Sequence, residues 1–161
     1  MPGSEVVARR AGRVLVIDAH GRVLLLHGFD PAGSEDPYWF TVGGGAKPGE
    51  SLAEAAAREL REETGLAATP GELGQPVWHE VSEFGFRGTW IRQEQDFFLL
   101  RVGSVQVSSD GLDDEEVSVV DGYRWWSVAE LEATTESFYP RELPGLLREL
   151  LPDLYSSIRQ R

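Results

Sequence analysis

A chain of 161 residues provides one domain with a full hydrophobic core and leaves no room for a second of ordinary size. Its apolar fraction of 41% and charged fraction of 26% exclude a disordered or fibrous protein. The net charge of −12, without a local basic patch, predicts no nucleic-acid partner and no binding to an anionic membrane.

Cysteine is absent, which excludes a disulfide framework, a thiolate metal site and a cysteine nucleophile. The first ten residues lack an apolar stretch of signal-peptide length, and the apolar runs are too short to span a bilayer. We therefore expect a single domain over residues 1–161, located in the cytoplasm, that binds a small molecule. A homodimer is left open.

The first predicted elements are strands. The β-prone runs Val14–Ile17 and Val23–Leu26 flank the turn-forming Asp18–Gly21, so we expect a hairpin or adjacent strands. Gly28–Pro37 lacks periodicity and is expected to be a loop, and Tyr38–Val42 is expected to be a short strand that leads into three glycines.

A helix of about three turns follows the glycines. Ser51 and Glu54 have the spacing of a capping box, and Gly65 supplies the left-handed residue that ends a helix. A small-residue arc on this helix is expected to pack on a sheet, and it comprises Ala53, Ala56, Ala57 and Leu60.

Three carboxylates converge on the neighbouring arc, because Glu59, Glu62 and Glu63 are surface neighbours on a helix. Like charges at this spacing repel, so they need a compensating cation. Oxygen ligands without His or Cys favour magnesium, with manganese and calcium as alternatives. Taken alone, the same pattern is equally compatible with a solvated acidic face.

The following stretch predicts a long hairpin, with strands over Val77–Phe86 and Thr89–Val102 around Arg87–Gly88. An acidic loop, Ser108–Asp121, then leads to a last strand, Tyr123–Ser127.

Two helices are expected at the end of the chain. Ser127 and Glu130 have capping-box spacing, and leucines at helical spacing precede Pro152. Together the elements predict an α/β fold with a mixed sheet and helices on both sides.

The residues from Gly44 to Leu66 resemble the Nudix box: Gly, five residues, Glu, seven residues, then Arg-Glu-aliphatic-any-Glu-Glu-any-Gly-aliphatic. Every specified position is filled here, by Gly44, Glu50, Arg58, Glu59, Leu60, Glu62, Glu63, Gly65 and Leu66. From average residue usage, a chance match in such a chain has a probability on the order of one in a million.

This resemblance implies a Nudix-like α/β/α sandwich and hydrolysis of a diphosphate linkage in a nucleoside diphosphate derivative, with Mg²⁺ or Mn²⁺ as cofactor. It implies that Glu59, Glu62 and Glu63 are metal ligands and that the Gly43 carbonyl is a possible further ligand. Glu50 and Arg58 are expected to form a structural ion pair. Val42 replaces the proline that often precedes the glycines in the family.

Several roles stay open at this point. Many members supply another acidic residue from a later loop, for which Glu115 and Glu116 are the candidates, and the general base is one of Glu59, Glu63, Glu115 and Glu116. The weaker candidates for phosphate contacts are Lys47, Arg87, Arg92 and Arg124.

No flanking motif of a Nudix subfamily is present, so the substrate is not predicted beyond its class. The main alternative is a non-catalytic Nudix-like module that senses a nucleotide, which the complete carboxylate set disfavours. An isomerase of the isopentenyl diphosphate type is excluded, because that chemistry resembles one needing a cysteine.

Overall fold

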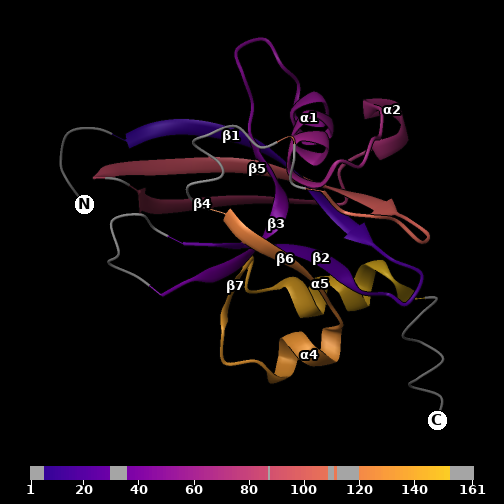
Figure 1. Cartoon of the computed structure of the whole chain (residues 1–161). Helices are drawn as coiled ribbons and strands as arrows, with labels where there is room; N and C mark the ends of the chain where they lie inside the picture. The colour runs from indigo at the N-terminus through magenta and orange to yellow at the C-terminus, as the bar shows by residue number, and fades with distance from the viewer. Residues whose placement is uncertain (1–5, 30–35, 87, 109–110, 112–119, 153–161) are drawn as a thin grey trace. The chain divides into compact units, whose positions relative to one another are not determined.

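The computed structural model describes residues 6–29, 36–86, 88–108, 111 and 120–152 (Figure 1). The chain divides into two compact units. The first comprises Met1–Leu15, Val42–Leu100 and Val105–Asp113, and the second comprises Val16–Thr41, Arg101–Ser104 and Asp114–Arg161. A single domain over residues 1–161 stays a prediction.

The first unit contains two antiparallel strand pairs. Strand β1 (Val6–Ile17) pairs with β3 (Tyr38–Gly45), with Ala11 opposite Gly45 and Val14 opposite Val42. Strands β4 (Trp78–Phe86) and β5 (Thr89–Arg101) run side by side as the predicted hairpin (Figure 1). Strand β5 is the neighbour of β1. Both β1 and β3 are longer than predicted, and β3 continues through the three glycines.

Helix α1 (Leu52–Thr64) begins and ends where the sequence predicts. The Ser51 hydroxyl accepts a hydrogen bond from the Glu54 amide, and the Glu54 carboxylate accepts one from the Ser51 amide. Gly65, at φ 76°, ends the helix in the left-handed region. Both ends are local in sequence, which is why sequence alone predicts them.

The packing face of α1 differs from the predicted arc. Ala56 and Leu60 are buried as expected, whereas Ala53 and Ala57 are only half-buried and Ala55 is buried instead. The buried face is rotated because Glu59 and Glu63 also point into the protein. A short helix, α2 (Pro70–Leu73), follows. It was not predicted, although Thr69 and Glu72 form its capping box.

The second unit contains the mixed part of the sheet. Strand β2 (Val23–Gly28) forms the predicted hairpin with the end of β1 and pairs antiparallel with β3 and with β6 (Val120–Trp126). Strand β7 (Ser137–Tyr139), which was not predicted, pairs parallel with β3.

Two helices complete this unit. Helix α4 (Val128–Ala133) begins at the predicted cap, Ser127, and packs against α5 (Leu143–Leu150), whose leucines are buried on one side as predicted. Among the described residues, no helix is long and apolar enough to cross a membrane.

Gly12 allows α1 to lie directly on β1. A Cβ on Gly12 would lie 2.1 Å from the Leu52 carbonyl oxygen and 2.9 Å from the Ala56 amide nitrogen. Both atoms belong to the backbone, so neither can rotate away. The close approach of helix and strand therefore depends on this glycine.

We expect Gly12→Ala to destabilise the protein by about 1–3 kcal/mol, because the helix must shift away from the strand. Urea unfolding followed by circular dichroism measures this change. Gly85→Ala is the matched control, since a Cβ there would meet its nearest atom, in Trp90, at an ordinary 3.7 Å. Equal stability of the parent and Gly12→Ala would contradict the packing described.

Candidate active site

The acidic arc of α1 is mostly buried. Glu59 is 8% exposed and Glu63 is 6% exposed, whereas the Glu62 side chain is 31% exposed. The Glu59 carboxylate lies flat against Gly44, where a Cβ would come within 2.8 Å of Cδ. Buried carboxylates are costly unless they are paired, so the arc is not an ordinary solvated face.

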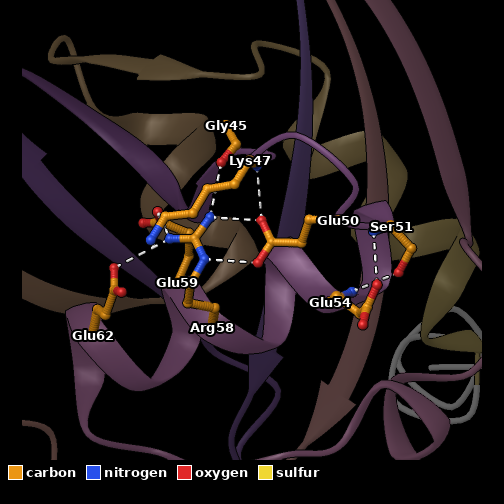
Figure 2. Close-up of polar contacts among 8 residues, drawn as sticks. All are labelled: Gly45, Lys47, Glu50, Ser51, Glu54, Arg58, Glu59 and Glu62. Carbon is orange, nitrogen blue, oxygen red and sulfur yellow. Dashed lines mark hydrogen bonds and ion pairs between the residues drawn. The ribbon is translucent and has the colours of Figure 1, made fainter.

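Arg58 connects Glu59 and Glu62 to the preceding loop (Figure 2). Its Nε and Nη2 donate to the two carboxylate oxygens of Glu50 at 2.8 and 2.9 Å. Nη1 donates to Glu59 at 2.8 Å and more weakly to Glu62 at 3.4 Å. Nη2 also donates to the Gly45 carbonyl at 3.0 Å. Three carboxylates thus share one guanidinium.

The Glu50–Arg58 ion pair implied by the Nudix resemblance is present. The Arg58 hydrogen bonds lower the pKa of Glu50 to about 2, and the same bonds raise the pKa of Arg58. Glu50 also accepts a hydrogen bond from the Lys47 amide at 2.9 Å. This bidentate pair therefore fixes the loop between β3 and α1 to the helix.

The amide and the carbonyl of Gly43 both form hydrogen bonds with side chains. Its amide donates to Glu63 Oε1 at 2.8 Å, and its carbonyl accepts from Arg13 Nη1 at 2.8 Å. Arg13 Nε in turn donates to Gln95 Oε1 on β5 at 3.0 Å. The sequence analysis missed Arg13 and Gln95, although an arginine directly before an apolar strand was an available signal.

A second arginine missed by the sequence analysis, Arg9 on β1, lies at the end of the glycine run. It is half-buried, and its Nε lies 2.9 Å from where a Cβ would lie on Gly45. Burial lowers the pKa of Arg9, while the nearby Glu59 carboxylate raises it. Among the described residues, its guanidinium has no hydrogen-bond or ion-pair partner.

These carboxylates, glycines and arginines belong to a stretch that matches known proteins. A family model of the NUDIX domain matches residues 7–146. The chain belongs to the Nudix family. This membership confirms the family and the enzyme class, Nudix pyrophosphohydrolase, that the sequence predicts.

The chain is also similar to individual Nudix proteins, although the identities are modest. The chain is 41% identical to a CTP pyrophosphohydrolase of Escherichia coli over 68 residues, which is 42% of this chain and 49% of that protein. It is 29% identical to an RNA pyrophosphohydrolase of Gluconacetobacter diazotrophicus over 81% of this chain and 83% of that protein.

A solved structure supports the fold. The MutT protein from Methanosarcina mazei is similar with a TM-score of 0.61 at 20% identity, covering 92% of this chain and 96% of that chain. The predicted Nudix α/β/α fold is therefore confirmed.

The structure brings Glu50, Arg58, Glu59, Glu62 and Glu63 of the Nudix box together around one loop. Glu115 and Glu116, like Arg87, lie outside the described residues.

Among the other weak phosphate-contact candidates, Lys47 lies in this loop, and its amide donates to Glu50 at 2.9 Å (Figure 2). Lys47 and Arg92 are exposed. Arg124, in the second unit, stacks on Trp126 at 3.8 Å and pairs with Glu130 at 2.8 Å.

The donor set fits a hard divalent cation. The candidate ligands Glu59, Glu62 and Glu63 offer only carboxylate oxygens. Glu59 and Glu62 share the Arg58 guanidinium with Glu50, so one positive charge faces three negative charges there. Among the described residues, no three acidic, His or Cys groups are close enough to form a metal site by themselves. Magnesium is suited to such an open arrangement, because water and substrate phosphates normally complete its coordination.

We expect Glu50→Gln to lower the free energy of unfolding at pH 7 by about 1–2 kcal/mol, because it removes a partly buried charge-assisted pair. Since the pKa of Glu50 is lowered to about 2, its stabilisation is present above its ordinary pKa and is lost as the pH falls towards 2. Urea unfolding at several pH values measures the difference between the two proteins.

The difference between parent and Glu50→Gln should therefore be constant near neutral pH and shrink below about pH 4.5. Glu54→Gln retains a hydrogen-bonding group at the helix cap and is the control, for which no comparable loss is expected. A difference for Glu50→Gln that did not change between pH 7 and pH 3 would contradict the assigned ion pair.

Proposed function

We propose that this protein hydrolyses the diphosphate linkage of a small nucleoside diphosphate derivative, with Mg²⁺ as its cofactor and Mn²⁺ as a possible replacement. The observation that carries this proposal is the burial of two carboxylates, Glu59 on the Arg58 guanidinium and Glu63 on the Gly43 amide. Burial of charged carboxylates adds little to the stability of a helix, and this supports a functional role for Glu59 and Glu63.

Glu59, Glu62 and Glu63 are the residues proposed to hold the metal. When bound, a divalent ion supplies positive charge to the phosphate oxygens and to the water that attacks phosphorus. The Gly43 carbonyl, expected as a further ligand, already accepts a hydrogen bond from Arg13. We therefore propose the three carboxylates as the main metal ligands and the Gly43 carbonyl only as an additional one.

Arg58 and Glu50 are proposed to be positioning residues. The bidentate pair fixes the rotamer of Arg58, and the remaining donors of Arg58 then orient Glu59 and the Gly45 carbonyl. A carboxylate that is fixed before the substrate arrives costs less to organise during the reaction.

In the reaction, a water oxygen forms a bond to one phosphorus, and the bond from that phosphorus to the bridging oxygen breaks. The water proton passes to a carboxylate, for which Glu59, Glu63, Glu115 and Glu116 are the candidates.

A small nucleotide is favoured over a nucleic acid as the substrate. By their names, the two relatives reported above are pyrophosphohydrolases that act on CTP and on RNA, and pyrophosphohydrolysis cleaves a phosphoanhydride linkage. The net charge of −12 opposes binding of a long polyanion.

Purified protein with Mg²⁺ should release phosphate-containing products from at least one compound in a panel. The panel comprises nucleoside triphosphates, nucleotide sugars, ADP-ribose, dinucleotides and an RNA with a 5′-triphosphate. Products are separated by chromatography and phosphate is measured. Inactivity on every compound, with nucleotide binding retained, would replace this proposal with the nucleotide-sensor alternative.

Glu62→Gln should lower turnover on the order of 100-fold while changing stability without metal by only a few tenths of a kcal/mol. The contact between Glu62 and Arg58 is long, at 3.4 Å, so its loss costs little. Removal of the Glu62 negative charge also relieves repulsion between the carboxylates of the arc. Magnesium should stabilise the variant less than the parent, because stabilisation follows affinity for the folded state. Thermal melts with and without Mg²⁺, together with turnover, test both parts.

Arg61→Gln is the matched control, because Arg61 is exposed on the same helix and should affect neither quantity. If Glu62→Gln kept parental turnover and parental stabilisation by Mg²⁺, the metal assignment would be wrong.

A further inference from the structure

We propose that Arg9 binds a non-bridging oxygen of the substrate's diphosphate group, an inference that rests on the proposed function. Arg9 lies at the glycine run with Arg13 and Arg58, and it differs from both in having no hydrogen-bond or ion-pair partner among the described residues. Arg9 lies outside the Nudix box, so the resemblance to that motif did not predict a role for it.

Geometry places the Arg9 guanidinium at the loop. Strands β1 and β3 are still hydrogen-bonded beyond the end of β3, where the Ala46 amide donates to the Arg10 carbonyl at 2.8 Å. Nε, Nη2 and Cζ of Arg9 lie 2.9, 3.1 and 3.4 Å from the position of a Cβ on Gly45. The Gly45 carbonyl accepts from Arg58, so one glycine separates the two guanidinium groups.

The burial of an unpartnered guanidinium is costly, and this cost needs an explanation. In the structure, the Glu59 carboxylate supplies an attractive charge without a hydrogen bond. Glu59 is also a proposed metal ligand, so a bound divalent cation would cancel this attraction. Arg9 would then face a cation with all of its donors free, and a phosphate oxygen is the anion that the reaction brings there.

Arg10 provides an internal comparison. It is the next residue on β1, carries the same charge and is exposed. Successive side chains of a strand point to opposite faces, so Arg10 points away from the side on which Arg9 contacts Gly45. A merely general attraction for anions would depend on both arginines, whereas a specific contact depends on Arg9 alone.

Methylenediphosphonate is a suitable probe, because its carbon bridge cannot be hydrolysed. In the presence of Mg²⁺, titration calorimetry should show binding to the parent and a loss of affinity of about tenfold or more in Arg9→Gln. Arg9→Lys keeps the charge without the planar fork and should have intermediate affinity. Arg10→Gln should bind like the parent.

Gly45→Ala gives a second, independent perturbation. The three atoms nearest to its new Cβ all belong to the flexible Arg9 side chain, so the protein should fold while the guanidinium is displaced. This variant should also weaken binding of methylenediphosphonate, and combining it with Arg9→Gln should cause no further loss. Additive losses in the double variant would overturn the proposed contact.

Binding of the probe to Arg9→Gln within twofold of the parent would overturn the inference, as would absence of binding to the parent. The proposed function is judged separately, by turnover of the parent on the substrate panel. If the parent is active and Arg9→Gln has the same turnover, only the proposed role of Arg9 is refuted. An inactive parent that binds the probe through Arg9 refutes only the hydrolase.

Discussion

The candidate site depends on the sharing of one guanidinium, that of Arg58, among three carboxylates and a backbone carbonyl. Its bidentate bond to Glu50 ties the loop to the helix, and its remaining donors reach Glu59 and Gly45. One residue therefore sets the loop conformation and the orientation of a candidate metal ligand. A lysine has a single nitrogen and could not make these contacts together.

Close approach of the backbone makes this arrangement possible. Gly12 lets α1 lie on β1, Gly44 leaves space for the Glu59 carboxylate, and Gly45 leaves space for Arg9. The glycines thus lie where a helix, a carboxylate and a guanidinium each need the volume of a missing side chain. In this loop, absence of side chains is what brings opposite charges near one another.

The two strand arginines beside the loop differ in what they contact. Arg13 donates to the Gly43 carbonyl and to Gln95, and Gln95 donates to Glu80 at 2.7 Å, so Arg13 joins the loop to the β4–β5 hairpin. Arg9 has no such bonds among the described residues. The same side-chain type therefore supports the structure at one position and remains open to an anion at the other.

The ends of α1 and the β4–β5 hairpin follow from the sequence alone, because capping and strand alternation act over short distances. The Glu50–Arg58 pair was implied by the resemblance to the Nudix box. The sequence did not reveal that Glu59 and Glu63 are buried, or that α1 packs through Ala55 in place of Ala53 and Ala57. These points, and the positions of Arg9 and Arg13 beside the glycines, depend on how the strands and α1 pack together. The positions of the two arginines follow from the register between β1 and β3, which residues distant in sequence set together.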